Sequence, residues 1–216
     1  MKRIFFLIIG CFLCMPLSLN ARNIKELFIS EPGDVIPLLS QSVKMDMLDY
    51  LDAGRMAEVN NALGKGTHFN KVTDNYMSIQ VTKSSCVELL LMPVSATDSI
   101  IIAITTFNLP AKDSRIDFYT TDWGKYVHNE RFFKEPSLND FIYIPKGVKT
   151  KKEEIFKNID FPVIQYVINP DKYAITATNN IKDYMSKDDY EKVSPYLCHE
   201  IEYIFKDGKF HKSLSK

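Results

Sequence analysis

The sequence has little glycine, a single tryptophan and no excess of either charge. Glycine occurs 8 times in 216 residues, and no G-x-S-x-G pattern is present. A serine nucleophile on a strained turn is therefore not predicted. Lys and Arg together number 27, as do Asp and Glu. Because nucleic-acid binding needs a basic patch or stripe, this balance argues against a nucleic-acid partner.

Metal-ligand spacings are also missing. The histidines, which lie in no H-x-H or H-E-x-x-H pattern, are His68, His128, His199 and His211. Cys198 and His199 are adjacent, but neighbours on a strand point to opposite faces and do not form a nucleophile and base pair. We therefore predict no catalytic residue, no metal and no cofactor.

One long apolar run is present, and it lies at the start of the chain. Two basic residues precede the run over 4–13, and Pro16 follows it. This order is typical of a secretory signal peptide over residues 1–21, with cleavage between Ala21 and Arg22. The run is shorter than the about 20 apolar residues that a membrane span needs. We therefore predict an exported protein with no stable membrane span after cleavage.

Cysteine usage is low outside this leader. Two of the four cysteines lie in the leader, which leaves Cys86 and Cys198. An oxidising compartment permits a bond between them without requiring it. Such a bond would contribute about 4 to 5 kcal/mol on the loop-entropy model. Two free thiols that behave as small hydrophobes are the alternative.

The first part of the mature chain has helical periodicity. Four apolar residues share one face: Val43, Met47, Leu48 and Leu51. Four charged residues are assigned to the opposite face: Lys44, Asp46, Asp49 and Asp52. This pattern predicts an amphipathic helix that ends at Gly54. Ser30-Glu31-Pro32 predicts another short helix toward Leu39. The three aspartates could attract calcium, but without a glycine-containing ligand loop a solvated face is favoured.

The period then changes to two. Residues 75–83 alternate between apolar and polar, which predicts a half-buried strand. The runs over 86–94 and 100–107 are apolar on both faces, as in strands covered on both sides. Residues 115–121 return to alternation. The short connections favour an antiparallel meander, so residues 22–123 are predicted to hold helices plus the main sheet.

The remainder predicts a second, smaller β-rich part. Residues 124–160 are expected to be a linker with short helical turns, including capping patterns at Ser137 and Thr150. Residues 161–216 contain a predicted hairpin, a helix capped by Ser186, and a second hairpin around Asp207-Gly208. This part could pack into the same domain. The predicted class is α+β: N-terminal helices, an antiparallel β meander, then a β-hairpin, helix and β-hairpin segment.

The most distinctive segment covers residues 113–123. Alternation places three of its polar or aromatic side chains outward on a strand that ends in an aspartate and the sole tryptophan. Arginine beside aromatic residues is typical of recognition surfaces. The predicted ligand-binding residues are Arg115, Asp117, Tyr119, Asp122 and Trp123. An Arg115 to Asp117 ion pair with Trp123 in the core explains the pattern equally well.

Five segments together resemble a known family. They are Asp113-Ser-Arg-Ile-Asp-Phe-Tyr-Thr-Thr-Asp-Trp123, Thr73-Asp-Asn-Tyr76, Glu88-Leu-Leu-Leu-Met-Pro93, Pro195-Tyr-Leu197 and Gly208-Lys-Phe210. In these the chain is similar to a secreted Bacteroidetes family of unknown function, domain of unknown function 3256, over nearly all of its mature length. The resemblance implies export from a Gram-negative cell and assigns no activity.

These observations support one leading functional hypothesis. It is an exported, non-enzymatic accessory or binding protein of the periplasm or cell surface, whose partner is an envelope protein, a glycan or a small molecule. The alternative is a periplasmic hydrolase with carboxylate acid and base residues, for example Asp117 and Asp122. A structural module stabilised by calcium is a third hypothesis.

Overall fold

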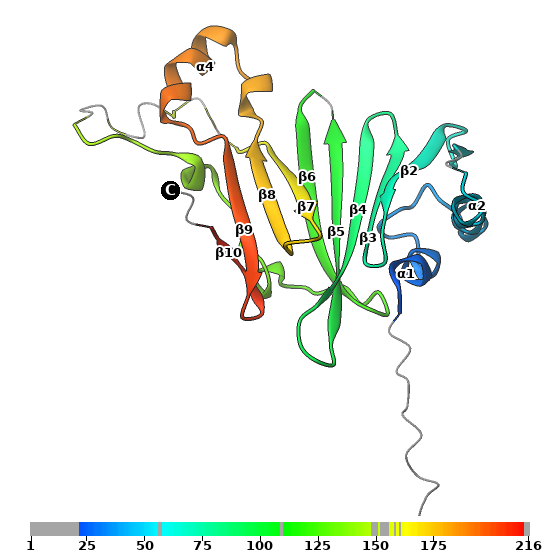
Figure 1. The fold of residues 1–216 in the computed structure, drawn as a ribbon. Helices are drawn as coiled ribbons and strands as arrows, with labels where there is room; N and C mark the ends of the chain where they lie inside the picture. Colours follow the sequence, from blue (N-terminus) through cyan, green and yellow to red (C-terminus); the bar gives the residue numbers. More distant parts are fainter. Residues whose placement is uncertain are drawn as a thin grey trace, which may run out of the picture.

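The computed structural model describes residues 22–55, 58–108, 110–147, 151, 156–157, 159 and 161–213. The predicted leader and the capping pattern at Thr150 lie outside the described residues. The described chain forms a six-stranded and a four-stranded antiparallel sheet (Figure 1). Together with the helices described below, they confirm the α+β class. No described helix is long and apolar enough to cross a membrane.

The six-stranded sheet is a meander in chain order. Its strands are β1 (Val59–Asn60), β2 (Gly66–Val72), β3 (Tyr76–Thr82), β4 (Ser85–Pro93), β5 (Ser99–Asn108) and β6 (Lys112–Thr120). Each strand pairs with the next one along the chain, so the predicted meander is confirmed. β4 and β5 are buried on both faces over most of their length, as their doubly apolar runs indicated.

The four-stranded sheet has the order β10-β9-β8-β7. Its strands are β7 (Ile164–Asn169), β8 (Ala174–Asn179), β9 (Glu200–Lys206) and β10 (Lys209–Lys212). Both predicted hairpins are confirmed. Asp207 and Gly208 have φ angles of 51° and 81°, the positive values that a two-residue turn needs. Between the hairpins lies α4 (Lys187–Val193), where the Ser186 hydroxyl accepts from the backbone N–H of Asp189.

The N-terminal helices are α1 (Ile24–Ser30) and α2 (Gln41–Asp52). The helix predicted from Ser30 toward Leu39 was wrong, because the helix lies before Ser30 instead. Asn23 caps it by accepting from the backbone N–H of Glu26 at 3.0 Å. α1 then ends at Ser30, because Glu31 precedes Pro32 and the residue before a proline is disfavoured in helical conformation.

α2 is confirmed, but one of its charged side chains was assigned to the wrong face. Lys44 is 1% exposed. Its Nζ donates to Glu31 Oε2 at 2.5 Å and to the Glu31 carbonyl oxygen at 2.8 Å. The other carboxylate oxygen accepts from the backbone N–H groups of Gly33 and Val35. Lys44 lies three and four positions before Met47 and Leu48, so helical spacing places it inward, where the ion pair satisfies its charge.

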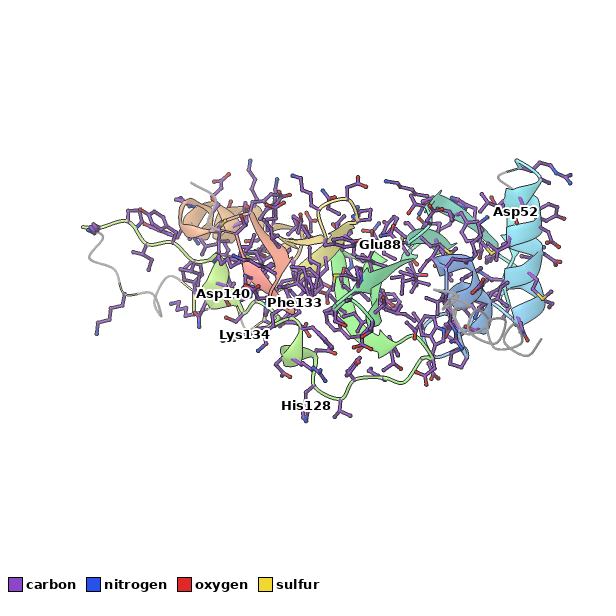
Figure 2. All side chains as sticks on the ribbon, turned by 60° about the horizontal axis from the view of Figure 1, so that its bottom comes forward. Asp52, Glu88, His128, Phe133, Lys134 and Asp140 are labelled. Carbon is purple, nitrogen blue, oxygen red and sulfur yellow. The ribbon has the colours of Figure 1, made fainter. Side chains whose placement is uncertain are left out.

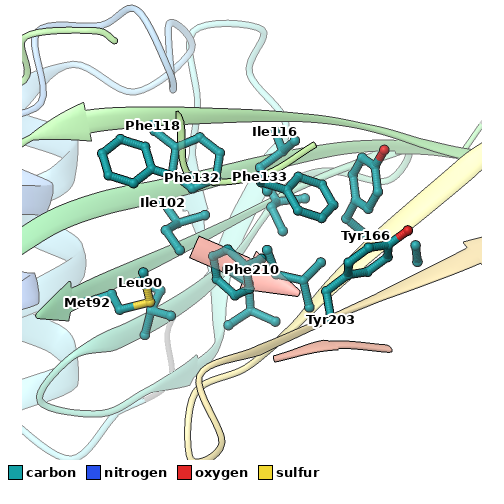
Figure 3. Close-up of a cluster of buried hydrophobic side chains, with 14 of the residues drawn as sticks. Leu90, Met92, Ile102, Ile116, Phe118, Phe132, Phe133, Tyr166, Tyr203 and Phe210 are labelled. Carbon is teal, nitrogen blue, oxygen red and sulfur yellow. The ribbon is translucent and has the colours of Figure 1, made fainter. Parts of the chain in front are cut away.

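A hydrophobic core lies on each side of the six-stranded sheet. On its helix face, α1 and α2 pack on side chains such as Met77, Leu89 and Ile101. On its inter-sheet face, side chains such as Leu90 and Ile116 pack against the four-stranded sheet. Figure 3 shows this second core, with Tyr166, Tyr203 and Phe210 contributed by the four-stranded sheet. The larger sheet is therefore the middle layer, between helices and a second sheet (Figure 1).

The segment expected to be a linker contributes to the inter-sheet core. It forms the short helical turns η1 (Asn129–Arg131) and η2 (Leu138–Phe141), and the Ser137 capping box is confirmed. Its Phe133 is 1% exposed and makes edge-to-face contacts with three aromatic rings of the four-stranded sheet. Phe132 and Phe141 are buried in the same core. The described part of this segment therefore fills the space between the sheets.

Cys86 and Cys198 are both free thiols. Cys86 lies in β4 and is half-buried, whereas Cys198 lies just before β9 and is exposed.

Candidate functional site

The five predicted ligand-binding residues are divided between core and surface. Their alternation along β6 is as predicted, but Asp117 and Tyr119 are 6% and 3% exposed. The expectation that these two side chains face water was therefore wrong, because Tyr119 packs in the helix-side core and Asp117 is in contact with Arg115 and Lys125. Trp123 is also buried, whereas Arg115 and Asp122 are exposed. Their role in ligand binding remains a prediction.

Trp123 closes a tight turn that holds α1 against the sheet. Its φ angle is 67°, and its backbone N–H donates to the Thr120 carbonyl at 3.0 Å. The indole Nε1 donates to the Leu27 carbonyl oxygen of α1 at 3.1 Å. The ring packs edge-on against Tyr119, with 5.4 Å between the ring centroids. The tryptophan is thus a core residue that anchors a helix, which is the alternative that the sequence left open.

Asp117 holds two cationic side chains. Its Oδ2 lies 2.8 Å from Arg115 Nε, and its Oδ1 lies 2.8 Å from Lys125 Nζ. The carboxylate side chain is 8% exposed, whereas those of Arg115 and Lys125 are 61% and 53% exposed. A guanidinium has five N–H donors and an ammonium has three. Asp117 therefore contacts one nitrogen of each cation, and most of their donors are left for other partners.

Asp122 has different surroundings, in the turn after β6. It is exposed and accepts a hydrogen bond from the Thr120 hydroxyl, which lowers the pKa of the Asp122 carboxyl. Nearby, Arg22 Nη1 donates to the Thr121 carbonyl at 2.6 Å. A general acid needs a raised pKa. The lowered pKa of Asp122 therefore disfavours this residue as the acid of a hydrolase.

A second polar cluster, which sequence reasoning missed, lies on the inter-sheet face. Its centre is Glu88 of β4, which is 8% exposed (Figure 2). The Tyr76 hydroxyl donates to Glu88 Oε1. Burial raises the pKa of Glu88, and burial also raises the pKa of Tyr76 and of Cys86.

Further polar side chains lie beside this cluster, because Ser78 of β3 is paired with Glu88 of β4. The Ser78 hydroxyl lies 3.6 Å from Cys86 Sγ, and Asn70 Nδ2 donates to the Ser78 hydroxyl at 3.4 Å. Asn70 is exposed. The signal in the sequence was Glu88 itself, a carboxylate within a run that is otherwise apolar on both faces, since charged residues are rarely buried without partners.

Metal-binding groups do not gather in the part of the chain that the structure describes. No three or more His, Cys, Asp or Glu residues there could hold a metal ion together. The aspartates of α2 are exposed, and Asp52 Oδ1 lies 2.6 Å from Lys25 Nζ. Figure 2 shows Asp52 on α2, well away from Glu88.

Comparisons with known proteins identify a fold and a family. A solved structure of a domain of an uncharacterized protein from Porphyromonas gingivalis W83 is similar, with a TM-score of 0.78 and 22% sequence identity. The match covers 88% of this chain and 98% of that chain, so the two share a fold. No curated protein matches the chain. The family model described as a protein of unknown function, DUF3256, matches residues 16–210, and the chain therefore belongs to that family.

Proposed function

We propose that this protein is an exported, non-enzymatic binding protein of the periplasm or cell surface of a Gram-negative bacterium. We further propose that Arg115 and Lys125 bind an anionic group, a carboxylate or a phosphate, on its ligand. The ligand is an envelope protein, a glycan or a small molecule. The observation that supports the binding proposal is the contact of one buried carboxylate, that of Asp117, with two exposed cationic side chains.

This arrangement supports anion binding for a physical reason. Asp117 neutralises one of the two positive charges and leaves the other available. It also holds both side chains in place before a ligand arrives, which lowers the conformational entropy that binding must otherwise remove. A guanidinium held at Nε can still present its terminal N–H groups to a planar carboxylate or a phosphate. Asp117 is therefore a positioning residue in this proposal.

The binding proposal is tested by titrating the protein with inorganic phosphate and with succinate in a calorimeter. We expect Arg115→Ala with Lys125→Ala to weaken binding by at least about tenfold, the loss of one or two charge-assisted hydrogen bonds. The matched control is Lys25→Ala, which removes an exposed lysine of a different ion pair. Equal affinity of the folded double variant and the wild type would refute the assignment of these two residues.

The export proposal rests on the order of basic, apolar and small residues in 1–21. Amino-terminal sequencing of the protein from its native cells should begin at Arg22, with the protein recovered in periplasmic or extracellular fractions. Recovery of a chain that retains Met1 in the membrane fraction would contradict export as a cleaved protein.

A further inference from the structure

The helices cover only part of the helix face of the six-stranded sheet. Ile101 and Ala103 of β5 pack in the helix-side core. Thr105 and Phe107 continue this face toward the end of β5, because side chains two positions apart on a strand point to the same side. Thr105 is half-buried, and Phe107 is 56% exposed. The end of the β5–β6 hairpin, which lies away from α1 in Figure 1, is therefore an uncovered part of this face.

Phe107 lies one strand away from Arg115 of the proposed anion site. β5 and β6 keep an unbroken antiparallel register along the whole of β6. In this register Arg115 is opposite Thr105, so it is the diagonal neighbour of Phe107 on the same face. Diagonal neighbours on one face of a sheet are about 7 to 8 Å apart, within reach of aromatic and long side chains. A small ligand that contacts one of these two residues can therefore also contact the other.

The two carboxylates near Phe107 already have partners. Asp113 is paired with Phe107 across the two strands, and its Oδ1 accepts from the backbone N–H of Ile164 on β7 at 3.1 Å. Asp117, farther along β6, has one oxygen in contact with each of two cationic side chains. A ligand beside Phe107 therefore meets the N–H donors of Arg115 rather than a carboxylate without a partner.

The charge at this site matches a carboxylate. Arg115 Nε lies 2.8 Å from Asp117 Oδ2, and the arginine side chain is 61% exposed. The Nη nitrogens, at the other edge of the guanidinium, can donate to the two oxygens of a carboxylate. Arg115 and Lys125 on one Asp117 leave one positive charge, which equals the single negative charge of a carboxylate. A phosphate monoester carries about −1.5 to −2 at neutral pH and is matched less well.

We propose that the ligand is a small carboxylic acid with an apolar chain or ring, whose carboxylate binds Arg115 and Lys125 while its apolar part packs on Phe107. This inference rests on the proposed anion binding and names the chemical class of the ligand. A single exposed apolar side chain is common on protein surfaces, so the position of Phe107 beside the cations is what assigns its role. Contact with the ring removes apolar surface of both partners from water, which favours binding.

The experiment compares phenylbutyrate with butyrate by calorimetric titration of the full mature chain. The two acids share a carboxylate, but only phenylbutyrate has a ring to place on Phe107. We expect the wild type to bind phenylbutyrate at least about fivefold more tightly than butyrate, from partial burial of two rings. Phe107→Ala should bring the two affinities to within about twofold of each other, while its affinity for butyrate stays that of the wild type.

Two further variants separate the apolar contact from the anion contact. Phe161→Ala is the matched control, because Phe161 is 57% exposed and lies outside the six-stranded sheet, beside Tyr184. It should keep the preference for phenylbutyrate. Arg115→Ala with Lys125→Ala should instead weaken the binding of both acids. Since Phe107 is exposed, Phe107→Ala should unfold in urea as the wild type does, so a loss of preference is not a loss of fold.

The outcomes distinguish this inference from the proposed function. Equal affinities of the wild type for the two acids would overturn the role of Phe107 and leave the anion-binding proposal standing. A preference for phenylbutyrate that persists in Phe107→Ala would do the same. Binding of neither acid by the wild type would contradict both proposals.

Discussion

The two faces of the six-stranded sheet are covered in different ways. On the helix face, α1 and α2 are fixed by a buried ion pair and by the Trp123 indole. On the inter-sheet face, aromatic packing is combined with two side-chain acceptors on β6, Asp113 and Ser114, for N–H groups of β7. The comparison indicates that the helices are joined to the sheet by a buried ion pair and an indole hydrogen bond, whereas the four-stranded sheet is joined to it mainly by aromatic packing and by polar contacts along β7.

The largest expected loss of stability comes from a substitution in the inter-sheet core. Phe133→Ala removes a side chain that is 1% exposed and contacts three rings of the four-stranded sheet. We expect the free energy of unfolding in urea to fall by about 3 to 5 kcal/mol, the usual result for a buried phenylalanine. A loss below about 1 kcal/mol would mean that this residue does not join the sheets as described.

The next largest loss of stability is expected from a substitution on the helix face. Lys44→Ala leaves the buried Glu31 carboxylate without its cation, although two backbone N–H groups still donate to it. We expect a loss of about 3 kcal/mol, at the lower end for a broken buried pair. In the control Lys25→Ala, an exposed pair is removed and the loss should stay below about 1 kcal/mol. Similar losses of stability in both variants would contradict the claim that the buried ion pair contributes more than the exposed one.

A smaller loss of stability is expected from a substitution that tests how Trp123 holds α1. Trp123→Phe keeps an aromatic ring in the core but removes the indole N–H that donates to Leu27. We expect a loss of about 1 to 2 kcal/mol in urea unfolding, from one hydrogen bond and the acceptor left unpaired. Unchanged stability would show that ring packing alone anchors α1.

The smallest expected effect on stability at neutral pH comes from two buried tyrosines, one on each side of the six-stranded sheet. Burial raises the pKa of Tyr119, on the helix face, and of Tyr203, on the inter-sheet side, to about 12 each. Because both values are raised, their stabilisation is present below the ordinary tyrosine pKa of about 10 and is lost as pH rises toward 12. Tyrosinate absorbance and unfolding at alkaline pH should show this loss, and each Tyr→Phe variant should reduce it. Ordinary titration of both phenols would contradict their burial.

Much of the sheet structure could be predicted because strand periodicity and turn residues act locally. The doubly apolar runs of β4 and β5 and the Asp207-Gly208 turn each carried enough local information. The position of α1 was missed because its cap, Asn23, follows the leader directly and its apolar face is short. The burial of Phe133 was missed because its partners come from β7, β9 and β10, far along the chain.

The candidate site was predicted less completely than the fold. The alternation of Arg115, Asp117 and Tyr119 was visible in the sequence, but the helix that covers part of this face was not. Lys125 as a second cation on Asp117 depends on the turn after β6. Asp113 and Ser114 accept from N–H groups of β7 only when the sheets pack, so these hydrogen bonds have no local sequence signal.

The central contrast between the two faces is tested most directly by native-state hydrogen exchange on the wild type at neutral pH. We predict that amides of β7 to β10 open together at a lower free energy than those of β3 to β6, which stay protected with α1 and α2 until global unfolding. A single opening free energy shared by both sheets would contradict the account.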